Sequence, residues 1–178
     1  ALYAPDYQGS TPLLMGLALG IYGLSQSLLQ LPMGLLSDRI GRRTVVLAGL
    51  GLFALGSVVA AMSTTIVGLI VGRFLQGSGA VSSALMALVA DLTTEQHRTR
   101  AMAAVGASIG LAFSVAMIAG PGLASVVGLS GLFWITSVLA LLGIVLLLTV
   151  VPVPVAQASP ETLPAIALLK RLLLDHDL

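Results

Sequence analysis

The chain has 178 residues, of which 57% are hydrophobic and 8% are charged, and its mean hydropathy is +1.07. Soluble domains carry about 25% charged residues, so this composition excludes an ordinary water-soluble fold and predicts an all-α membrane protein. The net charge of +1 gives no sign of a nucleic-acid partner, and the absence of cysteine excludes disulfides and thiolate metal sites.

Long uncharged runs predict five membrane spans. A spanning helix needs about 20 mostly apolar residues, and the two longest runs exceed this length. They are divided where polar turn residues interrupt them, at 63–65 and 128–130. The predicted spans cover residues 11–36, 44–63, 66–90, 100–127 and 130–151.

Local signals mark where some of these spans begin. Thr11 followed by Pro12 offers an N-cap and a first-turn proline for the first span. Thr93 with Gln96 is typical of a capping box before the fourth. Glycine pairs spaced by four, at 16/20, 68/72 and 106/110, predict faces of close helix packing.

The basic residues predict the orientation. Seven of the eight lie in the turns after the first and third spans or after the fifth, so that side is the cytoplasm by the positive-inside rule. The N-terminus then lies outside and the C-terminus inside. An odd number of spans starting outside predicts a further helix before Ala1, with residues 1–9 as its outer end and the loop that follows.

The sequence changes character after the last span. Residues 10–152 are the predicted transmembrane bundle, and four prolines between 152 and 164 indicate a linker. The apolar stretch 165–174, interrupted by Lys170 and Arg171, suits an amphipathic segment on the inner membrane face. Residues 153–178 are therefore expected to form a cytoplasmic linker.

The segment 34–43 between the first two spans carries four charges within six residues. Asp38 lies at the C-terminal end of one predicted helix and Arg42 at the N-terminal end of the next, where the helix dipoles disfavour both signs. Asp91, at the end of the third span, is equally misplaced. We expect Asp38, Arg42 and Asp91 to form a charge cluster, with Asp38 free to cap a helix outside this chain. Ordinary solvated loop charge is the alternative.

Arg73 is the one charge inside a predicted span. An arginine in mid-membrane costs about 2.5–3.5 kcal/mol on insertion scales, so it normally faces the protein interior or a wet cavity. Snorkelling to the outer interface is the alternative. Gln76 follows Arg73 by three residues and shares its helix face.

Two further features could shape a cavity. Tyr22, Gln26 and Gln30 recur every four residues on one face of the first span, which suits either hydrogen bonding between helices or a cavity wall. Gly120 and Pro121 predict a kink in the fourth span, because proline removes a helical hydrogen bond.

The segment from Gly34 to Arg43 resembles the loop between the second and third helices of the major facilitator superfamily. The matching residues are Gly34, Leu36, Asp38, Arg39, Gly41, Arg42 and Arg43. In that superfamily the loop is a latch that holds the cytoplasmic side closed. The resemblance thus implies an inner gate formed by Gly34, Asp38, Arg39, Gly41, Arg42, Arg43 and Asp91.

Other stretches resemble the proton-coupled drug antiporter branch of that superfamily. Residues 73–80 are similar to its fourth-helix motif, which implies proton coupling through Arg73 with Gln76 beside it. Gly120 and Pro121 resemble its fifth-helix motif, although Ala116 and Ala124 stand where glycine is preferred. Weaker candidates for the cavity wall are Tyr22, Gln26, Gln30, Phe113 and Met117.

The resemblance implies helices two to six of a twelve-helix transporter in a bacterial inner membrane. Its partners would be the lipid bilayer, a small-molecule substrate and a second bundle absent from this chain. A proton gradient, rather than a cofactor, would drive export by alternating access. We expect no enzyme, catalytic set or metal, because His97 and His176 lie far apart. A proton-independent sugar or metabolite facilitator and a non-transporting receptor or scaffold remain alternatives.

Overall fold

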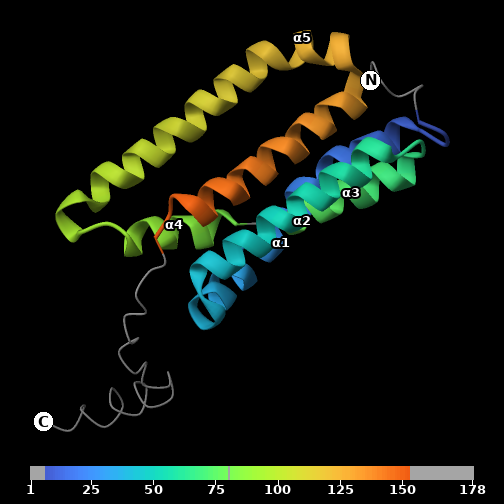
Figure 1. Cartoon of the computed structure of the whole chain (residues 1–178). Helices are drawn as coiled ribbons and strands as arrows, with labels where there is room; N and C mark the ends of the chain where they lie inside the picture. The colour runs from blue at the N-terminus through green and yellow to red at the C-terminus, as the bar shows by residue number, and fades with distance from the viewer. Residues whose placement is uncertain (1–6, 80, 153–178) are drawn as a thin grey trace, which may run out of the picture.

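The computed structural model describes residues 7–79 and 81–152, and every regular element in this part of the chain is a helix (Figure 1). The helices are α1 (Pro12–Ile40), α2 (Arg42–Met62), α3 (Ile66–Ser78), α4 (Ser82–Asp91) and α5 (Glu95–Thr149). The predicted all-α membrane fold is confirmed. Most of the predicted segments 1–9 and 153–178 lie outside the described residues.

α1 begins as predicted and ends later than predicted. The hydroxyl oxygen of Thr11 accepts a hydrogen bond from the backbone N–H of Leu14 (3.2 Å), and Pro12 occupies the first turn. The helix then continues to Ile40, and α2 starts after a single residue, Gly41, at φ 96°. The expectation of a loop over 34–43 was therefore wrong: Gly41 alone makes the turn, since glycine adopts positive φ without steric cost.

The predicted third span is described as two helices, α3 and α4, on either side of position 80, which lies outside the described residues. α3 ends at Ser78, and the N–H of Gly79 closes it by donating to the carbonyls of Leu75 and Gln76. Glycine is a poor helix former, and here it also permits close packing. A methyl group at Gly79 would lie 2.5 Å from the carbonyl oxygen of Gly49 on α2. Gly79 thus follows the end of α3 and lies in close contact with α2.

α5 contains the two last predicted spans in one element. Its backbone leaves the helical region only at Gly128 (φ 69°, ψ −179°), and Figure 1 shows the chain turning back there, with the yellow and orange arms side by side. Four helical stretches of the described chain are long and apolar enough to cross a membrane, at 12–40, 42–62, 66–91 and 95–149. The count of five separate spans is therefore not confirmed.

The start of α5 corrects the predicted capping box. Thr94, not Thr93, precedes the first helical residue, and it makes no side-chain capping bond. The hydroxyl of Thr93 instead donates to the carbonyl of Val89. Thr93 therefore belongs to the end of α4 rather than to the start of α5.

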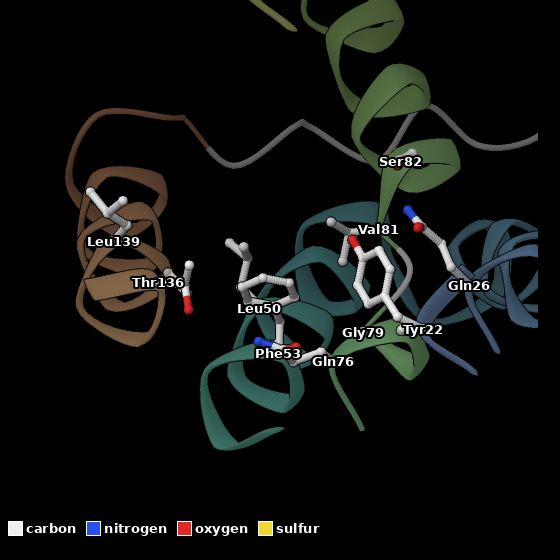
Figure 2. Close-up of a pocket in the computed structure, with 12 residues that line it drawn as sticks. Tyr22, Gln26, Leu50, Phe53, Gln76, Gly79, Val81, Ser82, Thr136 and Leu139 are labelled. Atoms are coloured by element: carbon white, nitrogen blue, oxygen red, sulfur yellow. The ribbon is translucent and has the colours of Figure 1, made fainter. Parts of the chain in front are cut away.

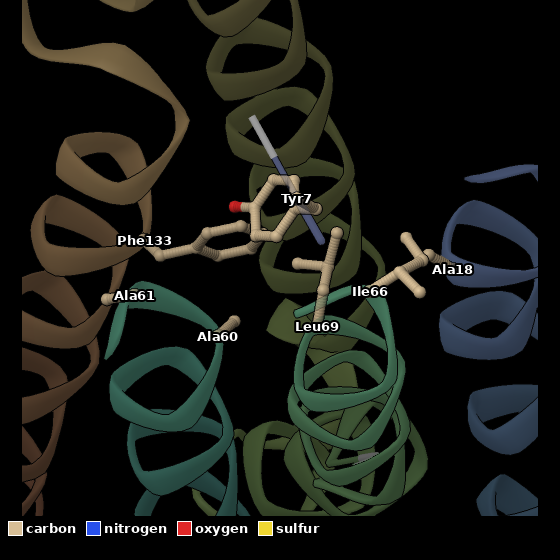
Figure 3. Packing of buried hydrophobic residues seen from close by; sticks show 7 residues of the cluster. All are labelled: Tyr7, Ala18, Ala60, Ala61, Ile66, Leu69 and Phe133. Atoms are coloured by element: carbon tan, nitrogen blue, oxygen red, sulfur yellow. The ribbon is translucent and has the colours of Figure 1, made fainter. Parts of the chain in front are cut away.

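Two apolar clusters lie near opposite ends of α2. One gathers small, branched and aromatic side chains from the start of the chain, α1, α2, α3 and α5 (Figure 3): Tyr7, Ala18, Ala60, Ala61, Ile66, Leu69 and Phe133. The other contains Val45, Val46, Ala84, Leu88 and Leu147. All buried residues of α5 belong to its second arm, beyond Gly128. That arm is therefore the part of α5 that packs into the bundle.

Only part of the predicted glycine packing is present. A methyl at Gly72 would lie 2.6 Å from the backbone nitrogen of Ala60, and one at Gly56 would lie 2.5 Å from that of Gln76. α2 and α3 therefore touch through their backbones. Gly16, Gly20, Gly106 and Gly110 face open space within the described chain, so close packing at the pairs 16/20 and 106/110 stays a prediction.

Candidate functional site

A cluster of three charged side chains joins the ends of three helices. Arg42 Nη2 lies 3.3 Å from Asp38 Oδ1, and Arg42 Nε lies 3.0 Å from Asp91 Oδ2. Arg42 is the first residue of α2, Asp38 lies in the last turn of α1, and Asp91 is the last residue of α4. The structure thus brings together the three residues that the sequence predicted to meet.

The helix ends explain why this cluster forms. A carboxylate at a C-terminus and a guanidinium at an N-terminus each oppose their own helix dipole, but together they neutralise one another. All three side chains are partly exposed, at 27% for Arg42, 57% for Asp38 and 41% for Asp91. Exposed ion pairs contribute about 0–1 kcal/mol, so this cluster can form and break at small cost.

The other predicted gate residues surround this cluster in different ways. A methyl at Gly34 would lie 3.1 Å from Ser83 Oγ, so glycine lets α1 approach α4 closely. Gly41 makes the turn between α1 and α2. Arg39 is exposed, and within 7–79 and 81–152 no ion pair is recorded for it.

Arg43 makes a contact that the sequence did not predict. Its Nη2 donates to the backbone carbonyl oxygens of Leu147 (3.1 Å) and Leu148 (3.0 Å), at the end of α5. These are terminal carbonyls that lack a partner within their own helix. The start of α2 therefore holds the ends of α1, α4 and α5, and a contact spanning more than 100 residues leaves no local sequence signal.

Arg73 lies within the apolar stretch 66–91, about 10 Å along α3 from its first residue at 1.5 Å per residue. Its Nη1 donates to Gln76 Oε1 (3.0 Å), and Gln76 Nε2 donates in turn to Ser57 Oγ on α2 (2.7 Å). Its Cζ lies 4.5 Å from the centre of the Tyr22 ring on α1. Arg73 therefore connects α1, α3 and α2 through one polar chain.

Every contact recorded for Arg73 is to an uncharged group. Besides Gln76 and Tyr22, its Nε donates weakly to the carbonyl of Ala18 at 3.5 Å. Within the described residues no carboxylate forms an ion pair with it. Gln76 is 3% exposed, so the neutral partner that holds the guanidinium is itself buried. The positive charge of Arg73 is thus solvated by dipoles and an aromatic face, without being neutralised.

A cavity of about 440 Å³ lies next to this polar chain (Figure 2). Its wall comes from α1, α2, the segment where α3 gives way to α4, and the second arm of α5. The lining residues are Tyr22, Gln26, Leu50, Phe53, Gln76, Gly77, Gly79, Val81, Ser82, Thr136, Leu139 and Ala140. Gln76 therefore belongs both to the cavity wall and to the polar chain of Arg73.

The cavity contains only part of the predicted wall. Tyr22 and Gln26 line it, whereas Gln30 does not, and the backbone carbonyl of Gln30 accepts a hydrogen bond from Ser83 instead (2.9 Å). Phe113 and Met117 lie on the first arm of α5, 67% and 66% exposed, away from this wall.

Gly120 and Pro121 also lie on the first arm of α5. The backbone there stays helical, and the break occurs at Gly128 instead. Among the described residues, no group of three or more histidine, aspartate or glutamate side chains could hold a metal ion.

Comparison with known proteins identifies one matching family and several named relatives. The sequence matches the Major Facilitator Superfamily over residues 1–176. It is 53% identical over 150 residues to the inner membrane transport protein YajR of Escherichia coli (strain K12), which covers 84% of this chain and 33% of that protein.

The names of two relatives with lower identity refer to a transported compound or to drug resistance. A triacylglyceride transporter of Mycobacteroides abscessus is 36% identical over 159 residues, covering 88% of this chain and 30% of the relative. The class B tetracycline resistance protein of Escherichia coli is 36% identical over 107 residues, covering 60% and 26%. The chain spans about a third of the length of these curated relatives.

Proposed function

Because the chain belongs to the major facilitator superfamily, we propose that it forms part of a secondary transporter that exports small molecules in exchange for protons by alternating access. Its four apolar helical stretches and its inner-membrane relative fit the predicted multi-pass protein of the bacterial inner membrane. The tetracycline resistance relative supports drug efflux as the kind of transport.

Arg73 is the observation that carries proton coupling. A charged side chain inside a membrane-spanning segment is energetically costly. Such residues typically belong to ion or proton pathways. Its hydrogen-bonded chain through Gln76 to Ser57 links three helices, so a change in local charge would be felt by all of them. We assign Arg73 to coupling and Gln76 to holding it in place.

The cluster at the inner face supports alternating access. Arg42 bridges two carboxylates, and Arg43 binds the end of α5, so the start of α2 can hold the inner side closed. Because the ion pairs are exposed and weak, they can break in each transport cycle. We assign Asp38, Arg42 and Asp91 to this gate, with Gly34 and Gly41 permitting its close packing.

Reconstitution of the full-length protein tests the proposal. Proteoliposomes with an imposed pH gradient would be given tetracycline and glucose as probes, and uptake would be followed together with internal pH. Flux that reverses when the gradient is reversed supports proton antiport. Flux that ignores the gradient indicates a facilitator. No flux of either probe, with the protein correctly folded, indicates a receptor or scaffold and contradicts the proposal.

A further inference from the structure

The cavity next to Arg73 has a charge environment that selects among ligands. Two of its wall residues, Tyr22 and Gln76, contact the guanidinium directly, one through its ring and one through Oε1. The positive charge therefore lies immediately behind the wall. A charge this close to the wall acts on a ligand in the cavity by the Coulomb interaction.

The acidic residues on α1 and α4 lie several turns beyond the wall residues of those helices. The cavity wall contains neither acidic nor basic side chains. Asp38 is twelve residues beyond Gln26 on α1, or about 18 Å at 1.5 Å per residue. Asp91 is nine residues beyond Ser82 on α4, or about 14 Å. Arg73 thus sets the sign of the potential in the cavity.

The wall also offers hydrogen-bond donors for an anion. Tyr22, Gln26 and Ser82 line the cavity, and no side-chain hydrogen bond is recorded for any of them within the described residues. Leu50, Phe53 and other apolar side chains make up the rest of the wall. The lining therefore suits a molecule with an apolar body and a polar head.

We propose that this cavity binds amphipathic organic anions and rejects cations of the same shape, with Arg73 determining the selectivity. Part of this inference rests on the proposed function, since it names the class of substrate that the transporter would export. The ligand's carboxylate would accept hydrogen bonds from Tyr22, Gln26 and Ser82, and its apolar body would lie against Leu50 and Phe53. Arg73 acts from behind the wall and needs no direct contact with the ligand.

Three probes with one naphthalene body test the proposal: naphthoate as the anion, naphthylmethylammonium as the cation and naphthylmethanol as the neutral compound. Their binding to the purified full-length protein would be measured by equilibrium dialysis, with empty micelles subtracted. We expect naphthoate to bind at least about tenfold more tightly than the ammonium compound, from a Coulomb interaction across several ångströms. Equal binding, or preference for the cation, would overturn the proposal.

Substitutions at Arg73 separate charge from shape. Arg73→Gln should bring the anion-to-cation ratio close to one. Arg73→Lys should keep most of the ratio because it keeps the charge. A ratio that survives in Arg73→Gln would assign selectivity elsewhere. The wild-type ratio decides the question by itself if either variant fails to fold.

A matched pair of substitutions locates the binding site. Leu139 lines the cavity and Leu142 does not, although both lie on the second arm of α5 and are 60% and 53% exposed. Leu139→Trp should weaken all three probes severalfold, and Leu142→Trp should leave them unchanged. Equal behaviour of the two variants would contradict binding in this cavity. Binding without proton-driven flux would sink the proposed function alone, and flux without charge selection would sink this inference alone.

Discussion

Arg42 and Arg73 are both cations next to apolar sequence, and their guanidinium groups have different kinds of partner. Arg42 lies where the ends of α1, α2 and α4 meet, partly exposed, with a carboxylate on each side at 3.3 and 3.0 Å. Arg73 lies within the apolar stretch 66–91 among neutral partners, a glutamine, a carbonyl and a tyrosine ring. The charge of Arg42 is neutralised by carboxylates at an exposed position, where the gain in stability is small. The charge of Arg73 is not neutralised by any carboxylate among the described residues.

This difference fits the two proposed roles, Arg42 in the gate and Arg73 in proton coupling. An ion pair at the water boundary contributes about 0–1 kcal/mol and can be exchanged readily. A guanidinium surrounded only by dipoles responds strongly to any new charge, because there is little screening around it. We therefore expect substitutions at Arg42 and its partners to have modest, salt-dependent effects, and substitutions around Arg73 to have large ones.

The largest effect is expected at Arg73. Arg73→Gln should lower proton-driven flux in proteoliposomes by at least about a hundredfold, which corresponds to about 2.7 kcal/mol. Arg98→Gln is the matched control, since Arg98 is an exposed arginine on α5 outside the proposed gate. It should retain flux within about twofold. Equal losses of flux in both variants would contradict a special role for Arg73.

Gln76 tests whether the neutral chain holds Arg73 in place. Gln76→Leu removes the acceptor of Arg73 and the donor to Ser57, and should lower the free energy of unfolding by about 1–3 kcal/mol. The measurement is unfolding in mixed detergent and urea. Gln30→Leu on α1, where only the backbone carbonyl is engaged, should change it by less than about 0.5 kcal/mol. A smaller effect at Gln76 than at Gln30 would contradict the chain.

Close packing beneath Tyr22 gives a third test. A methyl at Gly77 would overlap Ser25 Oγ and the carbonyl oxygen of Tyr22, so Gly77→Ala should push α3 from α1 and cost about 1–3 kcal/mol. Gly23→Ala has open space around it and serves as the control. Thermal unfolding of the two variants would show the difference. Indistinguishable midpoints would mean that α1 and α3 are not in close contact.

The smallest effect is expected at the inner gate. The chain has no cysteine, so Ser37→Cys, at a site 1% exposed in α1, would report opening of this face to a thiol reagent. Asp91→Asn or Asp38→Asn should raise its labelling rate by up to about fivefold, less at high salt. Glu95→Gln, an exposed acid outside the cluster, is the control. An unchanged rate in both aspartate variants would count against the gate.

The sequence predicted the charge cluster because its signs were wrong for isolated helices. Asp38, Arg42 and Asp91 each opposed a helix dipole, and such residues need partners from elsewhere in the fold. Hydropathy likewise located the spans, because a bilayer requires long apolar runs. Both signals are local, so one sequence was sufficient to detect them.

Contacts between distant segments could not be predicted in the same way. Glycines at 16 and 77 look alike in the sequence, yet only Gly77 meets a neighbouring backbone. The bond between Arg43 and the end of α5 and the absence of Phe113 from the cavity wall depend on how whole helices are arranged. The end of α3 also follows from this arrangement, since close contact with α2 occurs at Gly79.

The backbone contact between α2 and α3 has a mechanical consequence. Where Gly56 and Gly72 meet the facing chain, there is no space for even one added carbon atom, so these helices cannot slide or rotate past one another without collision. We expect α2 and α3 to move together during any rocking motion. The chain changes direction between helical segments at Gly41 and Gly128, both of which adopt positive φ angles that favour glycine.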